Sequence, residues 1–333
     1  MTAGQLNSFS STKVRSTIKF RIYFICGICF SLTFSGLISG CSTSAPQNQQ
    51  ITDPYEKMRQ DARNGNAEAQ YNLALMLDKG VKNEDGLIIT NIPEATEWYK
   101  KAAEQGHVEA QSKLGSMLYK GSSGVTANKS EAIKWLTKAA VQGLPEAQYN
   151  IGLIQYKGDG IPVDKIKAAE WFRKAAEQNY AYAQYYMGLM LYKGDGAPIG
   201  TTEATEWFRK AAEQGNAEAQ YRLGNILYNG YVSQDKTEAA KWFRKAAEQD
   251  HVVSQYNLAL ILYKGDGILA DKAEAAEWYK KAAIQGYTKA QYNLAVMLEQ
   301  GDGIPADMVE AKKWFEKAKE ENNDTQHVIS DFF

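Results

Sequence analysis

The sequence predicts an all-α protein built from seven helix–turn–helix units of about 36 residues. All seven tryptophans recur at intervals of 35 to 37 residues, and the next glutamine of the pattern always follows 13 residues later. From each glutamine to the tryptophan of its own unit the distance varies between 22 and 28 residues, so this connection contains a loop that accepts insertions. The two landmark sets are Trp98, Trp135, Trp171, Trp207, Trp242, Trp278 and Trp314, and Gln70, Gln111, Gln148, Gln184, Gln220, Gln255 and Gln291.

Each unit begins with a helix that carries the glutamine and ends at a glycine. In the fourth unit, Ala181 to Gly215, two helix-favouring stretches flank a segment rich in Gly, Pro and Asp. A glycine stands ten residues after every landmark glutamine, where a left-handed residue can close the first helix. These glycines are Gly80, Gly121, Gly158, Gly194, Gly230, Gly265 and Gly301.

The second helix of each unit has a predicted start and end. Seven residues before the tryptophans stand six strong N-cap residues and one glycine: Asn91, Asn128, Asp164, Gly200, Asp235, Asp271 and Asp307. Eight residues after the tryptophans stand residues that tolerate positive φ: Gly106, Gly143, Asn179, Gly215, Asp250, Gly286 and Asn322. Alanine three before and four after each tryptophan indicates close helix packing, with the indoles as core between units.

These residues resemble the Sel-one-like repeat (SLR) family, which is related to the tetratricopeptide repeats. The family pattern matches Ala183-Gln184-Tyr185, Gly188, Tyr192 to Gly194, Ala204 to Trp207 and Lys210 to Gly215. The resemblance extends from about Ala67 to Asn322. It implies a right-handed α-solenoid. Members of this family typically act as adaptors that hold protein partners.

The two ends of the array depart from the pattern. Residues 53–66 are predicted to form an N-terminal capping helix, in which Pro54 to Asn64 reads as a degenerate second helix. Seven repeats follow over residues 67–322, and residues 323–333 form a C-terminal tail or cap. Phe332 and Phe333 either cover the last repeat or present a motif to a partner.

The N-terminal segment predicts export and lipid attachment. Residues 1–40 contain four basic residues and no acid, followed by an apolar run that ends in Ile38-Ser39-Gly40-Cys41. This ending resembles the bacterial lipobox, which implies a cleaved signal peptide and a lipidated Cys41. By the same resemblance, Ser42 implies the outer membrane, facing the periplasm. The alternative is an uncleaved signal anchor, because 17 apolar residues approach the length of a membrane span.

The remainder of the mature chain is polar at its start and lacks thiols. Residues 41–52 are predicted to form the lipidated cysteine and a flexible tether. Cys26 and Cys29 lie in the signal, so their spacing does not indicate a redox centre, and no cysteine follows Cys41. Without the four basic residues of the signal the net charge is about −5, which argues against nucleic acid as a partner.

Nothing in the sequence points to an enzyme, a cofactor or a metal. The three histidines lie in distant repeats, and His107 and His251 are predicted to be solvated turn residues. Gly-Asp-Gly turns such as that at Asp195 offer one carboxylate each, too few for calcium. No catalytic residue, cofactor or metal ligand is therefore predicted.

Two departures from the repeat pattern leave alternatives open. The first repeat carries extra residues between Val81 and Asn91, where Leu87, Ile88 and Ile89 either fold back onto helix ends or contact a partner. Gln155 stands where the other six repeats have leucine, so it lies near an edge or is hydrogen-bonded.

A stripe of tyrosines and lysines on the first helices is the predicted partner surface. Tyrosine follows the landmark glutamine in six repeats and recurs seven residues later, on the same side of the helix. By resemblance to tetratricopeptide repeats these positions line a concave groove. The predicted contacts are Tyr149, Tyr185, Tyr221, Tyr256, Lys157 and Lys193, with selectivity from Asn150, Tyr186, Arg222 and Asn257. The alternative is that the tyrosines pack between repeats.

The sequence therefore predicts a lipid-anchored scaffold that binds protein or peptide partners in the bacterial cell envelope. One alternative is a surface-exposed virulence factor that binds a host protein. A cell-wall or β-lactam hydrolase, known by analogy among secreted SLR proteins, is disfavoured by the missing cysteines and the lack of a catalytic cluster.

Overall fold

The structure, a computed structural model, describes residues 54–82, 88–121 and 124–325, all within the unit Thr52–Phe333. Over these residues it contains fifteen α-helices and one two-stranded sheet. The first helices of the seven repeats are α2 (Ala67–Lys79), α4 (Val108–Lys120), α6 (Pro145–Lys157), α8 (Ala181–Lys193), α10 (Ala217–Asn229), α12 (Val252–Lys264) and α14 (Thr288–Gln300). The second helices are α3 (Ile92–Glu104), α5 (Lys129–Val141), α7 (Lys165–Glu177), α9 (Thr201–Glu213), α11 (Lys236–Ala247), α13 (Lys272–Ile284) and α15 (Met308–Thr325).

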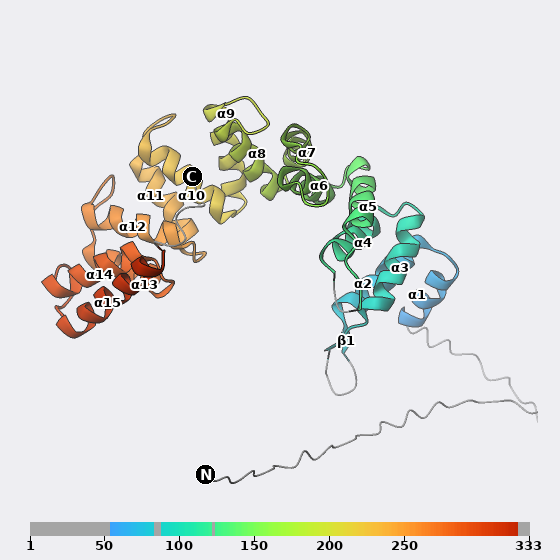
Figure 1. The fold of residues 1–333 in the computed structure, drawn as a ribbon, viewed down its shortest axis with the longest axis horizontal. Helices are drawn as coiled ribbons and strands as arrows, with labels where there is room; N and C mark the ends of the chain where they lie inside the picture. The colour runs from blue at the N-terminus through green and yellow to red at the C-terminus, as the bar shows by residue number, and fades with distance from the viewer. Residues whose placement is uncertain (1–53, 83–87, 122–123, 326–333) are drawn as a thin grey trace, which may run out of the picture. The chain divides into compact units, whose positions relative to one another are not determined.

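Each helix packs against the helix before it and the helix after it, which confirms the predicted solenoid-like array (Figure 1). The first repeat is preceded by α1 (Pro54–Arg63), in which Ala62 is buried. At the other end, α15 continues to Thr325, so Asn322 lies inside a helix and does not end one. The predicted helix end at Asn322 was therefore wrong.

The predicted helix ends are otherwise confirmed. All seven glycines that close the first helices have positive φ, and the last five, from Gly158 onward, are fully left-handed. Asn179 and Asp250 are the two non-glycine residues with positive φ among those described. At the second helices, the side chains of the Asn and Asp residues predicted as N-caps accept hydrogen bonds from backbone N–H groups three residues later.

In the first six repeats the residue after the tryptophan, more than the tryptophan itself, forms the centre of the repeat. Phe172, Phe208 and Phe243 are at most 1% exposed, whereas even the least exposed tryptophans, Trp242 and Trp278, are 7% exposed. The glycine on the facing first helix makes room for the ring: a Cβ atom on Gly188 would lie 2.9 Å from Phe208. Close packing of the two helices of a repeat therefore depends on this aromatic–glycine pair.

The tryptophans lie at the border of the core. In six repeats the indole N–H donates to a glutamate four residues earlier, as Trp278 does to Glu274 at 3.0 Å. In every repeat a lysine ammonium lies over the ring, as Lys281 does at 3.9 Å from the Trp278 centroid. One part of each indole ring is thus buried, and another part contacts charged side chains.

The landmark glutamines form a ladder of buried amides that joins successive repeats. Gln255 donates to the carbonyl of Ala247 on the preceding second helix at 3.2 Å, and its oxygen accepts from Gln285 at 2.9 Å. The first contact recurs in all seven repeats and the second in the first six. In the seventh repeat the buried Oε1 of Gln291 has no partner among the described residues. The ladder explains why this residue is a glutamine in every repeat.

A second inter-repeat contact joins a tyrosine, a lysine and an aspartate. The Tyr228 hydroxyl and the Lys236 ammonium both donate to Asp266 of the next repeat, each at 2.7 Å. We call this arrangement the clasp. It recurs as Tyr119–Lys129–Asp159, Tyr156–Lys165–Asp195 and Tyr263–Lys272–Asp302. The Gly-Asp-Gly turns are therefore structural contacts between neighbouring repeats.

The clasp is replaced between the fourth and fifth repeats. Tyr231 stands in place of the aspartate, and Thr201 in place of the lysine. The ring of Tyr231 lies 6.4 Å from that of Tyr192, and 60% of Tyr231 is exposed. This junction lacks the charged contact that is found at four other junctions, and it exposes an aromatic side chain.

The extra residues of the first repeat contain β1 (Val81–Lys82) and β2 (Ile88–Ile89), which pair antiparallel. Ile88 is 64% and Ile89 58% exposed, so these two side chains are not buried against helix ends. Leu87 lies outside the described residues.

Candidate ligand-binding groove

The predicted partner surface is formed by one side of the seven first helices, which we call the first-helix face. It comprises the position two residues before the landmark glutamine and the positions one, two, five, eight and nine residues after it, which recur on the same side of a helix. The glutamine itself points into the ladder, and a leucine, isoleucine or methionine three residues later is buried in the core. The variable positions of the face are therefore free to differ between repeats.

The four predicted tyrosines are half-buried and pack against neighbouring aromatic side chains. The Tyr149 ring centroid lies 5.9 Å from that of Phe172 and 5.4 Å from that of Tyr180, and burial raises the pKa of the Tyr149 hydroxyl. Tyr185, Tyr221 and Tyr256 make the same contact with the aromatic residue of their own repeat. Part of each ring therefore contributes to packing, and the remainder is accessible.

Lys157 and Lys193, the two predicted lysine contacts, are exposed at the ends of α6 and α8. Each lies near a clasp aspartate: Lys157 near Asp159, and Lys193 near Asp195. The pKa of each aspartate is lowered mainly by its clasp lysine, and Lys157 or Lys193 adds a smaller effect in the same direction. Neither lysine forms an ion pair of its own among the described residues. Both ammonium groups remain available to a ligand.

The centre of the face has a concentration of tyrosine. Tyr186 stands where most repeats have asparagine, and its ring stacks on Phe172 with centroids 5.0 Å apart. It also contacts Tyr149 and Tyr185, at 5.7 and 5.3 Å between centroids. Tyr182 extends this group and is 56% exposed. The result is a broad aromatic surface over α6 and α8.

The two histidines are N-caps of first helices, so their assignment as solvated turn residues was wrong. His251 Nδ1 accepts from the Ser254 backbone N–H at 3.2 Å, and Nε2 lies 3.1 Å from Glu218 of the preceding repeat. The imidazole side chain is only 17% exposed. His107 makes the equivalent contacts with Ala110 and Glu68 and is 10% exposed. A ring that caps one helix and reaches the previous one is more strongly fixed than a turn residue.

Glu218 connects His251 to Arg222, another variable position of the face. The Arg222 guanidinium lies 3.1 Å from Glu218, and its centre lies 5.4 Å from the Tyr221 ring. The hydrogen bond from His251 is the main cause that lowers the pKa of Glu218. The buried Nε of Arg222 has no partner among the described residues. The arginine is thus held in place but retains an unused donor.

Four hollows follow one another along the first helices of the last three repeats. The one beside α10 is lined by Tyr192, Phe208, Arg222, Asn225, Ile226, Asn229 and Tyr231, and has a volume of about 190 Å³. The next, of about 150 Å³, shares Asn225 and Asn229 with it and extends to Asn257 and Leu260 on α12. Because successive hollows share lining residues, they form a connected depression.

The third and fourth hollows continue this depression across α14. Leu260 also lines the third hollow, of about 300 Å³, together with Tyr263, Lys264 and Asn293. Tyr292 and Asn293 then belong to both the third hollow and the fourth, which measures about 640 Å³. We call the four hollows together the C-terminal groove.

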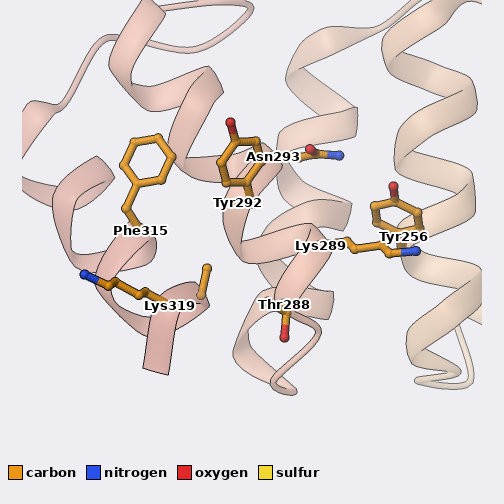
Figure 2. Close-up of a pocket in the computed structure, with 8 residues that line it drawn as sticks. Tyr256, Thr288, Lys289, Tyr292, Asn293, Phe315 and Lys319 are labelled. Carbon is orange, nitrogen blue, oxygen red and sulfur yellow. The ribbon is translucent and has the colours of Figure 1, made fainter. Parts of the chain in front are cut away.

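Figure 2 shows the widest part of the C-terminal groove. Lys289 extends from α14 toward Tyr256 on α12, while Tyr292 and Phe315 form an aromatic pair with centroids 5.6 Å apart. Lys319 extends from α15 on the other side. Of the six predicted contact residues, Tyr256 lines this groove, and Tyr149, Tyr185 and Tyr221 lie on the face before it.

The described residues contain no group of three or more His, Cys, Asp or Glu side chains arranged to hold a metal ion. Over the same part of the chain, no helix has the length and apolar character needed to cross a membrane. Cys41, the predicted lipidation site, lies outside the described residues, as do the predicted signal peptide and tether.

Comparison with protein families matches the Sel1 repeat over residues 67–107, 108–144, 145–180, 181–216, 217–251, 252–287 and 288–323. These seven matches are consecutive and cover most of the chain. The protein belongs to the Sel1 repeat family. It is a Sel1 repeat scaffold, and the match indicates no catalytic family. Comparison with curated proteins finds no match.

Two crystal structures of bacterial Sel1-type proteins are similar to the chain. One is a protective antigen present in uropathogenic Escherichia coli strains, which displays an SLR fold; it is 35% identical with a TM-score of 0.75. The alignment covers 81% of this chain but only 56% of that one, so this Sel1 protein spans little more than half the length of the antigen. The other is a Sel1 repeat protein from Oxalobacter formigenes, 31% identical with a TM-score of 0.64, covering 84% and 80% of the two chains.

The sequence analysis predicted contacts on the first-helix face but did not predict the groove in its last three repeats. A signal was present two residues before the landmark glutamine, where repeats one, two, three and five have glutamate. Repeats four, six and seven have Tyr182, Val253 and Lys289 there. The loss of acidic residues toward the C-terminal end marks the part of the face that differs from the rest.

Proposed function

We propose that this Sel1 repeat protein is a non-enzymatic adaptor that binds protein or peptide partners on its first-helix face. The observation that carries the proposal is the accessible aromatic surface from α6 to α14, which ends in the connected hollows of the C-terminal groove. Half-buried tyrosines are large and stiff, so they lose little conformational freedom when a ligand covers them. Repeat scaffolds bind proteins in general, and this face has the side chains for it.

We also propose that lipid on Cys41 attaches the adaptor to the bacterial outer membrane, facing the periplasm. Support comes from the basic, apolar and lipobox-like segments of residues 1–41. Replacing Cys41 by serine is expected to abolish incorporation of a labelled fatty acid and to release the protein from the membrane fraction. Unchanged labelling of Cys41→Ser would refute lipid attachment at this residue.

A surface-exposed protein that binds a host component is the second candidate. It is favoured by the similarity to a protective antigen of uropathogenic Escherichia coli. Protease treatment of intact cells separates the two locations: cleavage without lysis supports display on the surface, and protection supports the periplasm.

The adaptor proposal is tested by crosslinking the tagged protein in its native cells and identifying the captured partner. One variant carries Tyr149, Tyr185, Tyr221 and Tyr256 changed to alanine, with folding checked by circular dichroism. Because these rings pack against core aromatics, a second variant changes the same four residues to phenylalanine and keeps that packing.

A third variant, Lys157→Ala with Lys193→Ala, removes two exposed ammonium groups without touching the core. Loss of one partner from the folded variants supports binding on the first-helix face. A partner captured equally by the wild type and all folded variants would place the interface elsewhere, at the first-repeat hairpin or the C-terminal end, and would refute these contacts.

A further inference from the structure

We propose that the C-terminal groove selects an extended peptide segment rich in Asp and Glu. This inference rests on the proposed function and adds the chemical class of the partner. It follows from the charge of the groove, from its amide groups and from its shape.

The charge of the groove is opposite to that of the whole chain. Four cationic side chains line the hollows, Arg222, Lys264, Lys289 and Lys319, and no Asp or Glu does so among the described residues. The chain as a whole has a net charge of −1. Lys264, Lys289 and Lys319 form no ion pair with a described carboxylate, so their charges are available to a ligand. Like charges would be repelled and carboxylates attracted.

The first three repeats do not share this property. Glu68, Glu109 and Glu146 occupy the position that Lys289 occupies in the seventh repeat. The remaining glutamate of this set, Glu218 in the fifth repeat, lies within 3.1 Å of both Arg222 and His251. An acidic ligand is therefore favoured over the last three repeats and disfavoured over the first three.

Amide side chains run along the floor of the groove. Asn225 and Asn229 lie at the junction of the first two hollows, Asn257 in the second, and Asn293 at the junction of the last two. Each amide can donate and accept at once, which suits the alternating N–H and C=O groups of an extended peptide backbone. The tyrosines between them provide apolar walls for side chains.

The dimensions favour a single extended chain over a folded domain or a nucleic acid duplex. The first three hollows measure between about 150 and 300 Å³, which is the space for one or two side chains each. An extended peptide rises about 3.3 Å per residue, and packed helices lie about 8–10 Å apart. About three ligand residues would thus cross each of the three first helices, so about nine would span them, and a peptide of twelve residues is long enough to cover the groove.

The test measures binding of three fluorescein-labelled dodecapeptides to the purified full chain by fluorescence anisotropy. The peptides share leucine and serine at the same positions and carry Glu, Gln or Lys at the others. The Glu peptide is expected to bind about tenfold more tightly than the Gln peptide at about 50 mM salt, and to weaken as salt increases. The Lys peptide is expected not to bind.

A matched pair of variants locates the effect. Lys264→Glu with Lys289→Glu is expected to weaken binding of the Glu peptide about tenfold or more, because each change removes an attraction and adds a repulsion. Lys79→Glu with Lys120→Glu makes the same change in net charge on exposed lysines of the first two repeats and is expected to alter binding less than twofold.

Several results would overturn the inference. Equal binding of the Glu and Gln peptides would leave a peptide groove without charge selection. If the two double variants weakened binding of the Glu peptide equally, the effect would depend on the net charge of the protein and not on the groove. Displacement of the Glu peptide by a twelve-residue oligothymidylate at equal concentration would point to nucleic acid, and no binding at millimolar peptide would exclude acidic segments. The proposed adaptor function fails separately, when no partner depends on the first-helix face in cells.

Discussion

Replacing Gln155 on α6 with leucine is expected to stabilise the Sel1 array. The other six repeats have leucine at this position, and in the fourth and sixth repeats Leu191 and Leu262 are 2% exposed. Gln155 is partly buried as a residue, but its Oε1 atom is fully buried and has no hydrogen-bond partner among the described residues. The third repeat therefore contains a polar acceptor in a site that the fold otherwise fills with an apolar side chain.

The size of the effect follows from the cost of an unpaired acceptor. Burying such a group without a partner costs about 1–3 kcal/mol, and the substitution removes this cost. Leucine is close to glutamine in volume and already fits six equivalent sites, so the strain of the exchange is small. We expect the free energy of unfolding to increase by about 1–3 kcal/mol.

The measurement is urea-induced unfolding followed by circular dichroism. Repeat arrays do not always unfold in one step, so the whole curve and its midpoint are compared between proteins. The matched control is the reciprocal change Leu191→Gln, which is expected to lower the midpoint by burying a new amide. A midpoint of Gln155→Leu at or below that of the wild type would refute the reasoning, and would indicate that the glutamine is paired in solution.

Three further predictions concern the contacts between repeats. Gln255→Met removes two amide hydrogen bonds and is expected to lower the free energy of unfolding by about 1–3 kcal/mol. Gln291→Met also removes an unpaired acceptor, so its free energy of unfolding in urea should be nearly unchanged. Equal losses of stability in the two variants would contradict the ladder. The Lys236 ammonium and then the Tyr228 hydroxyl lower the pKa of Asp266, so its contribution is present above about pH 4 and lost as pH falls through the depressed pKa. Asp266→Asn should therefore unfold earlier than the wild type at pH 6 and converge with it in acid, and a constant difference across pH would count against the clasp. His251→Ala should cost about 1 kcal/mol, while His251→Asn, which restores a capping side chain, should cost less; equal melting temperatures for the two would argue against capping.

Most of the fold could be predicted because its determinants are local and repeated. The N-cap side chain of Asp271 and the left-handed Gly265 each act within a few residues, and seven copies of each signal remove the ambiguity of one. The predicted helix end at Asn322 was wrong because asparagine tolerates positive φ but does not require it, and α15 continues through this residue.

The candidate site was predictable only in part, because its geometry depends on contacts between repeats. The histidines were misread since their position holds Asn, Leu, Tyr or His in different repeats, and only the fold brings Glu218 to His251. The hollows result from the separation of first helices, for which a single repeat contains no signal. Tyr256 was selected as a ligand contact for its type, yet its place beside Lys289 depends on how α12 packs against α14.

The regular and irregular positions of this Sel1 array have different roles. Residues identical in every repeat, such as the ladder glutamines, are occupied by contacts that hold neighbouring repeats together, so a ligand cannot use them without breaking the array. Residues that depart from the pattern are not needed for these contacts between repeats. Tyr186, Arg222 and Lys289 all lie on the first-helix face, and the clasp is missing beside Tyr231 at one end of the C-terminal groove. Of the departures on the first-helix face, those at Tyr186, Arg222 and Lys289 all lie from the fourth repeat onward, which is the arrangement that selection for a single elongated ligand would produce.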